Sequence, residues 1–197
     1  MSTALLIDPR SSRSRRTGEE PLNVAVFETA LGWMALAVRR RSLVRLVFGY
    51  QNAEAAREAL RIAANAESDD ENDAGTASPT WLAALTDRLV GYAAGEADDF
   101  ADIPVWSDGW TPFQRRVLEA CRQIPFGQTQ TYAELAKAAG RPGAARAVGR
   151  TMATNPIPLV IPCHRVVGSR GALCGFSAEG GIPTKRRLLD LERRATV

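Results

Sequence analysis

The segment Asn155–Val167 has the sequence NPIPLVIPCHRVV, and the rest of the chain is organised around it. It contains His164, the only histidine among 197 residues, directly after Cys163. The apolar run before the pair predicts a chain that enters a hydrophobic core, and Pro162 ends that run. A thiol is a nucleophile only as thiolate, and an adjacent base or cation lowers its pKa. We therefore expect the Cys163 thiol at the mouth of a buried site, with His164 as its base.

Residue type alone favours a plainer interpretation. A cysteine after an apolar run is most often a small buried hydrophobe, and a single histidine is most often a structural group. The three cysteines, Cys121, Cys163 and Cys174, are an odd number without paired spacing. This pattern indicates a reducing compartment and argues against a disulfide scaffold. The lack of a CxxC-type pair also argues against a zinc site, and we expect Cys121 to be a core residue.

Composition and charge indicate a globular protein with a basic C-terminal half. The chain is 45% hydrophobic and 24% charged, with no apolar run long enough for a membrane span. From residue 111 onward there are 14 Lys and Arg against 5 Asp and Glu, about +9, whereas the first 110 residues hold 11 basic and 17 acidic residues, about −6. A basic half is typical of proteins that bind a phosphate backbone, although solvated basic faces are common.

We predict an α+β fold with two domains. Residues 1–20 are expected to form a disordered tail, 21–97 a small N-terminal α/β domain, 98–110 a linker and 111–197 a mostly helical C-terminal domain. Alternating apolar residues predict a three-stranded antiparallel sheet. Its strands are expected at 23–29, 33–38 and 42–48, followed by helices at 53–65 and from Ser78-Pro79 to 94, with an acidic loop at 67–73 between the helices.

The C-terminal half contains two capping boxes and a predicted helix-turn-helix. Thr111 and Thr131 each begin such a box, and the second opens a short helix that ends near residue 139. A glycine-containing turn at 140–143 leads to a helix at 144–153, a pattern typical of a winged-helix-like DNA-binding domain. Arg146 and Arg150 are four residues apart and therefore share one face. The alternative is a surface helix with two solvated arginines.

Taken with Arg146 and Asn155, the string Pro162–Val166 (PCHRV) resembles the active-site motif of the O6-alkylguanine-DNA alkyltransferases, the methylated-DNA–protein-cysteine methyltransferases. The resemblance extends from about residue 103 to 192. It implies a DNA-repair enzyme that flips O6-alkylguanine, mainly O6-methylguanine, out of the duplex. The alkyl group then passes irreversibly to Cys163, once per molecule, without cofactor or metal.

The resemblance also assigns roles to individual residues. Cys163 corresponds to the alkyl acceptor, and His164 to a base that acts through a water and is oriented by Glu192. Asn155 corresponds to a structural residue beside the site. Arg146 corresponds to the finger that fills the space left by the flipped base. The remaining residues assigned to substrate or DNA binding are Tyr132, Arg150, Arg165, Phe176, Ser177 and Lys185.

Three features depart from the family pattern. Phe176 stands where relatives have a pocket tyrosine, and the loop that contains it has two additional residues, Ala178 and Glu179. Arg150 stands where many relatives have a small residue, and we expect it to make an additional phosphate contact. The differences at Phe176 and in the loop length affect the range of alkyl groups rather than the reaction.

The expected partner is double-stranded DNA bound through the minor groove by a monomer, in a cytoplasmic, bacterial-type protein that associates with the nucleoid. Two other functions compete with this one. A lesion-binding protein without transfer would lack the acceptor cysteine, which is present here as Cys163. A cysteine hydrolase or thiol redox enzyme would turn over a small ester or disulfide without DNA. A multifunctional transcriptional activator would need a further DNA-binding domain.

Overall fold

The structure is a computed structural model that describes residues 22–65 and 79–195. The predicted tail, the acidic loop at 67–73 and the Ser78 cap lie outside these residues. The chain forms two compact units: the first comprises the chain up to Ala94 with Pro104–Trp106, and the second comprises Gly95–Ile103 with Ser107 onward. The predicted α+β class is confirmed, with strands in the first unit and mostly helices in the second.

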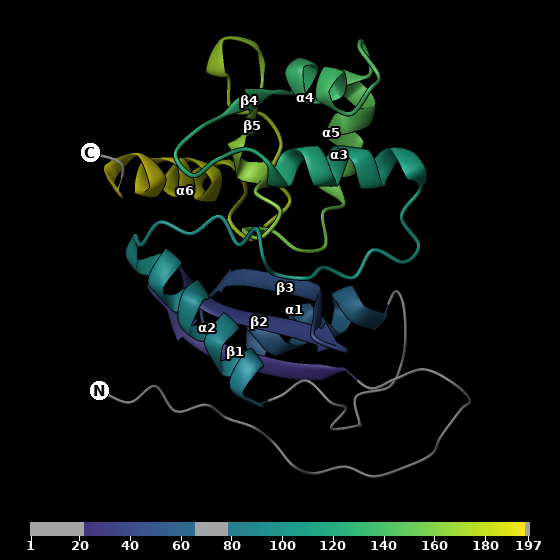
Figure 1. Ribbon diagram of the computed structural model, residues 1–197. Coiled ribbons are helices and arrows are strands. Elements are labelled where there is room, and N and C mark those ends of the chain that lie inside the picture. Colours follow the sequence, from purple (N-terminus) through teal and green to yellow (C-terminus); the bar gives the residue numbers. More distant parts are fainter. Residues whose placement is uncertain (1–21, 66–78, 196–197) are drawn as a thin grey trace. The chain divides into compact units, whose positions relative to one another are not determined.

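The first unit is built on an antiparallel meander of β1 (Asn23–Thr29), β2 (Gly32–Arg39) and β3 (Ser42–Tyr50), in the order β1-β2-β3 (Figure 1). Two-residue turns join the strands. Arg40 and Arg41 both adopt positive φ, 49° and 63°, which suits the twist of a tight hairpin. Gly32 has φ +96°, and a Cβ there would lie 2.9 Å from the carbonyl oxygen of Tyr50. The predicted sheet is confirmed.

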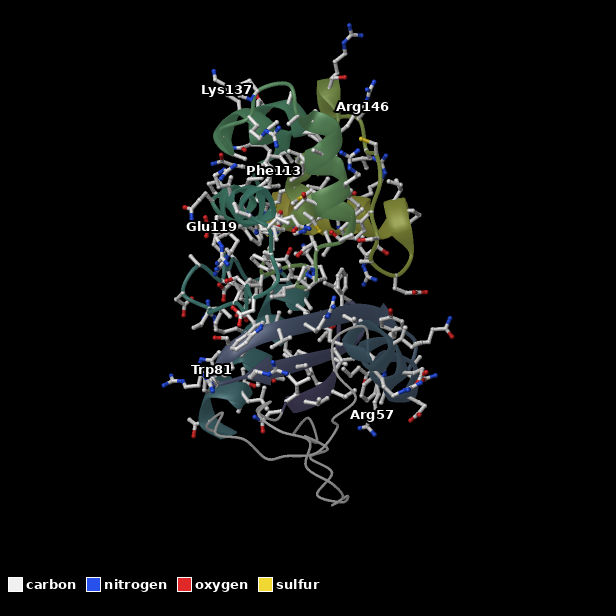
Figure 2. The ribbon with its side chains drawn as sticks, turned by 90° about the vertical axis from the view of Figure 1, so that its right-hand side faces the viewer. Arg57, Trp81, Phe113, Glu119, Lys137 and Arg146 are labelled. Atoms are coloured by element: carbon white, nitrogen blue, oxygen red, sulfur yellow. The ribbon has the colours of Figure 1, made fainter. Side chains whose placement is uncertain are left out.

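Two helices cover opposite faces of this sheet, as both views show (Figures 1 and 2). α1 (Ala53–Asn65) begins at the predicted cap, where the backbone N–H of Ala55 donates to Asn52 Oδ1 at 2.8 Å. It packs on the sheet through a core of Val26, Ala35, Ala37, Ala56 and Leu60. α2 (Pro79–Ala94) packs mainly against β1 and buries Leu82, Leu85, Leu89 and Tyr92.

The stretch predicted as a linker is divided between the two units. Leu43 of β3 donates its N–H to the carbonyl of Pro104 at 2.8 Å, and the N–H of Trp106 donates to the carbonyl of Leu43 at 2.9 Å. This is a short parallel bridge along the edge of the first sheet. Residues 95–103 belong to the second unit. The division into domains at 97 and 111 stays a prediction.

The second unit is mostly helical, and its elements are close to those predicted. They are α3 (Pro112–Arg122), β4 (Gln130–Thr131), α4 (Tyr132–Ala138), α5 (Ala145–Ala153), a 3-10 turn at Cys163–Arg165, β5 (Val166–Val167), a second 3-10 turn at Ser169–Gly171 and α6 (Gly181–Ala195). Both capping boxes are present, with Thr111 paired to Gln114 and Thr131 paired to Glu134. The parallel pairing of β4 with β5 was not predicted from the sequence.

α4 and α5 are joined by a turn in which Gly140 and Gly143 adopt φ +75° and +84°, so both predicted helices and their turn are present (Figure 1). α3 packs against both helices. Their shared core includes Val117, Leu118, Cys121, Leu135, Ala136, Val148 and Met152, and Cys121 is a core residue as predicted. The winged-helix-like detail stays a prediction. Among the described residues, no helix is long and apolar enough to cross a bilayer.

Candidate active site

Cys163 lies in the 3-10 turn that follows the buried apolar run. Ile157, Leu159, Val160 and Ile161 are each at most 1% exposed. Pro162 then ends the run, and the backbone N–H of Cys163 donates to the carbonyl of Ile161 at 2.7 Å. Cys163 is itself only 5% exposed, whereas Cys121 is fully buried. The structure therefore places Cys163 just below the surface, at the end of a buried segment.

The surroundings of the Cys163 thiol act on its pKa in opposite directions. Burial raises the pKa above its usual 9.0 and is the largest effect. A hydrogen bond from the Asn155 side chain, the charge of Lys185 and backbone N–H groups lower it, without overcoming burial. The resting sulfur is therefore a protonated thiol at neutral pH. A base must remove its proton before it can act as a nucleophile.

Asn155 connects the end of α5 to the cysteine segment. Its Nδ2 donates to the carbonyl of Ile161 at 2.8 Å, and its Oδ1 accepts from the N–H of Ile157 at 3.1 Å. Its own N–H donates to the carbonyl of Met152 in α5 at 3.3 Å. One side chain thus closes the loop that leads to Cys163, in line with the structural role that the resemblance implies.

His164 is fully buried, and its Nε2 lies 2.8 Å from Glu192 Oε1. Burial lowers the pKa of His164 below 6.5, with Arg165 and Lys185 acting in the same direction and Glu192 opposing them. The imidazole is therefore neutral at neutral pH. Because a carboxylate accepts only, the proton belongs on Nε2, and Nδ1 is the nitrogen that can take up a further proton.

The Glu192 carboxylate contacts His164, Arg165 and the backbone of Gly127. Burial by itself raises its pKa, but contacts with His164 and Arg165 outweigh burial and lower the pKa to about 2. Arg165 donates through Nε at 3.0 Å and through Nη2 at 3.0 Å. The N–H of Gly127 adds a bond of 2.9 Å. Glu192 is therefore an anion that fixes the His164 ring.

The position of Arg165 corrects the sequence-based expectation. It was assigned to DNA binding, but it is 1% exposed and its guanidinium is enclosed by Glu192, Asp99 and the carbonyl of Ile124, 2.6 Å from Nη1. Phe126 lies 5.6 Å from the guanidinium carbon. Arg165 therefore lies inside the protein, where it holds Glu192, and not at the surface.

Lys185 and Tyr132 converge on the loop after the cysteine segment. Lys185 is fully buried, and its Nζ donates to the carbonyl of Val166 at 2.5 Å and to that of Cys174 at 3.3 Å. The hydroxyl of Tyr132 donates to the same Cys174 carbonyl at 3.1 Å. Burial raises the pKa of Tyr132 to about 12, so the hydroxyl keeps its proton. The loop is thus tied to α4 and α6 beside the thiol.

The remaining predicted residues lie at the surface of the second unit. Arg146 and Arg150 are exposed on α5, and Figure 2 shows Arg146 at the edge of this unit. Ser177 is exposed and Phe176 half-buried in the loop 168–181. Thr184 Oγ1 donates to the carbonyl of Glu179 at 2.7 Å and so connects the additional loop residues to α6. In the described ranges, no group of three or more His, Cys, Asp or Glu is arranged to hold a metal ion.

Asp99 is a charged neighbour of the site that the sequence did not predict. Asp99 Oδ1 accepts from Arg165 Nη1 at 3.0 Å and from the N–H of Phe126 at 2.7 Å. Asp99 is 66 positions before Arg165 in a segment that had no periodicity, so no sequence signal connected the two.

The chain is similar in sequence to known proteins. The family model "6-O-methylguanine DNA methyltransferase, DNA binding domain" matches residues 112–194. A methylated-DNA–protein-cysteine methyltransferase of Mycolicibacterium paratuberculosis is 47% identical over 119 residues, 60% of this chain and 70% of that protein. One from Mycobacterium tuberculosis is 46% identical over 118 residues, 60% of this chain and 69% of that protein.

Solved structures extend the likeness over most of the chain. The crystal structure of Mycobacterium tuberculosis OGT in complex with DNA has a TM-score of 0.64 and 34% identity, covering 86% of this chain and 92% of that one. The O6-methylguanine-DNA methyltransferase of Pyrococcus kodakaraensis has a TM-score of 0.60 at 24% identity, covering 96% and 97%, and supports the fold alone. Because the chain is 47% identical to the Mycolicibacterium paratuberculosis protein and covers 70% of it, the chain belongs to the methylated-DNA–protein-cysteine methyltransferase family.

Proposed function

We propose that this protein repairs O6-alkylguanine, mainly O6-methylguanine, in double-stranded DNA by moving the alkyl group to Cys163. The observation that carries the proposal is the buried Cys163-His164 pair, whose imidazole donates from Nε2 to the Glu192 carboxylate at 2.8 Å. A thiol, an imidazole and a carboxylate in series are the parts of an activated nucleophile. Family membership supplies the substrate class, because the relatives are named for methylated DNA and a protein cysteine.

The chemistry balances within the protein and the damaged base. His164 accepts the thiol proton at Nδ1, through a water as the resemblance implies, and the thiolate attacks the alkyl carbon. The new S–C bond forms as the C–O6 bond breaks, and guanine leaves with the electron pair of that bond. The proton held by His164 then returns to the guanine side through solvent. Because a thioether does not release its alkyl group in water, each molecule reacts once.

Two neighbouring groups support this reaction. The positive charge of Lys185 favours the thiolate, since it lowers the pKa of Cys163 against the effect of burial. The Tyr132 hydroxyl, protonated because its pKa is raised to about 12, donates to the Cys174 carbonyl and so holds the loop that contributes to the pocket. We assign Ser177 and Phe176 to the pocket, where the Phe176 ring stacks on the base.

DNA engagement is assigned to α5. A base inside a duplex must leave the stack before it reaches a buried thiol, and minor-groove proteins insert side chains to keep the step open. The exposed Arg146 is suited to that insertion, and Ala147 and Gly149 allow the helix to approach the groove closely. Arg150 adds a phosphate contact. Binding as a monomer and location in the cytoplasm remain predictions.

A duplex with one labelled O6-methylguanine tests the proposal. The label should move from DNA to protein until it equals the amount of protein and then stop, with no further turnover. C163S should bind the same duplex without taking up label, whereas C174S, which alters the exposed loop cysteine, should take up label like the native protein. Label on C163S would contradict the proposal. Binding without uptake by the native protein would favour the lesion-binding alternative, and ester or disulfide turnover without DNA would favour the thiol enzyme.

A further inference from the structure

Asp99 reaches the candidate active site through an unbroken series of charged side chains. Its Oδ1 accepts from Arg165 Nη1 at 3.0 Å. Arg165 donates from Nε and Nη2 to Glu192, and Glu192 Oε1 lies 2.8 Å from His164 Nε2. His164 and Glu192 are fully buried and Arg165 is 1% exposed, whereas the Asp99 side chain is 45% exposed. Asp99 is therefore the solvent-facing end of the series.

The segment that carries Asp99 has a defined shape. Phe100 has a backbone φ of +49°, and its side chain is only 1% exposed. Its N–H donates to Asp98 Oδ1 at 2.7 Å. A left-handed backbone at a bulky residue is unfavourable and persists where the surroundings impose it. Arg122 of α3 supplies that restraint, because its Nη2 donates to the carbonyls of Phe100, Ala101 and Ile103 at 3.0, 3.2 and 2.9 Å.

These contacts divide the donors of Arg165 between two carboxylates. Asp99 and the carbonyl of Ile124 occupy Nη1, which leaves Nε and Nη2 directed at Glu192. The charge of Arg165 opposes protonation of His164, and Glu192 favours it. A second carboxylate on Arg165 offsets part of that opposing charge. Of the other charged groups that act on His164, Lys185 of α6 has the same sign as Arg165.

We propose that Asp99 is a positioning residue for alkyl transfer, which orients Arg165 and balances its charge so that Glu192 stays on His164. This inference rests on the proposed function of Cys163 and His164. Asp99 touches neither the thiol nor the base, so it acts through Arg165 and Glu192. The expected result of losing its charge is a weaker base at His164.

D99N tests this inference in the full chain, because it removes the charge while keeping an oxygen that accepts from Arg165 and Phe126. The single-turnover rate of methyl transfer should fall about two- to fivefold on the high-pH plateau, the range for a half-exposed ion pair. The rising limb of its pH–rate profile should move to lower pH. Without the Asp99 charge, the positive charge of Arg165 is less offset and lowers the pKa of His164 further. The ring signals of His164, the only histidine in the sequence, should titrate at lower pH in an NMR experiment.

D190N is the matched control. Asp190 is also 45% exposed and also pairs with an arginine, Arg193 at 3.3 Å, but that pair lies on the exposed side of α6. D190N should keep the native rate, limb and ring titration. D99E retains the charge, so its limb and ring titration should stay close to native even if its packing lowers the melting temperature.

A native rate and limb in D99N would overturn the inference. A slower rate with an unchanged limb and ring titration would also overturn it, because that result describes a purely structural role. An equal shift in D99E and D99N would do the same. The ring titration reports on folded molecules and needs no DNA. If the native protein transferred no alkyl group, the proposed function would fail while the titration still measured the coupling between Asp99 and His164.

Discussion

At the scale of single residues, Glu192 determines what His164 can do. Its carboxylate is fully buried and accepts from Gly127, His164 and Arg165, which keeps it ionised against the effect of burial. An ionised Glu192 holds the Nε2 proton of the imidazole. Nδ1 is then the only ring nitrogen that can act as a base. The buried Glu192 charge therefore leaves His164 able to accept one proton, at Nδ1.

E192Q removes this charge while keeping the shape of the side chain. The free energy of unfolding should fall by about 3 kcal/mol, because Arg165 is left buried with less compensation. The Glu192 carboxyl titrates at about 2 in the folded chain against an ordinary 4.5, so it stabilises the fold above pH 4.5 and this contribution is lost as the pH falls through about 2. Urea unfolding across that range should show a weaker acid dependence in E192Q.

The exposed Glu119 of α3 provides the control for E192Q. E119Q should change the unfolding free energy little, as surface substitutions usually do. Methyl transfer should be slower in E192Q and native in E119Q. Equal stability and equal transfer rates in the two variants would contradict the role given to Glu192.

The sequence predicted part of this site. The pairing of a cysteine with the only histidine was visible directly, and Glu192 was assigned by resemblance, since a glutamate near the end of a helix is otherwise a surface residue. The burial of Arg165 could not be predicted, because charged residues of a basic half are expected at the surface. Asp99 was missed because its contacts depend on how a segment without periodicity folds back on the second unit.

At the scale of elements, α5 connects the expected DNA contact to the chemistry. Its exposed face carries Arg146 and Arg150, and its end is tied to the cysteine loop through Asn155. Because the Asn155 side chain bonds to the backbone of Ile157 and Ile161, the end of α5 and the segment that carries Cys163 are held together. We expect its exposed arginines to control affinity and its buried side to control the position of Cys163.

R150A should weaken binding to every duplex sequence about equally, because a phosphate contact carries no sequence information. The slope of log affinity against log salt should become shallower by about 0.9, the value for one phosphate contact. Fluorescence anisotropy at several salt concentrations measures this slope. R193A, which removes an arginine that is 65% exposed on α6, should leave the slope unchanged. The same slope in native and R150A protein would rule out a phosphate contact.

The helices and the three longer strands were predicted well, whereas the two-residue strands and the 3-10 turns were not. The strands were visible from alternation, and α3 and α4 from their caps, because Thr111 and Thr131 supply local hydrogen bonds. β4 and β5 are two residues each, too short to show a period, and they pair in parallel across distant positions. The 3-10 turn at Cys163–Arg165 follows from Pro162 and tertiary packing, which a sequence pattern does not show.

At the scale of the whole molecule, the titration of His164 contributes to stability. The unfolded imidazole takes up a proton near its ordinary pKa of 6.5, whereas burial lowers the pKa in the folded chain. The unfolded state therefore binds more protons below pH 6.5, and the free energy of unfolding should fall as the pH drops through that value.

H164Q isolates this contribution. Its unfolding free energy, measured by urea denaturation between about pH 7.5 and pH 5, should depend less on pH than that of the native protein. The comparison uses the shape of the pH dependence, so an overall loss of stability in H164Q does not affect it. An identical pH dependence in the two proteins would contradict a buried, neutral His164.

The central claim is that the alkyl group ends on one sulfur atom. The direct measurement is peptide mass spectrometry of the native protein after reaction with a duplex that contains one O6-methylguanine. The account predicts a gain of one methylene mass, carried only by the peptide with Cys163, while the peptides with Cys121 and Cys174 keep their native masses. An unmodified Cys163 peptide after the DNA has lost its methyl group, or the added mass on another residue, would contradict it.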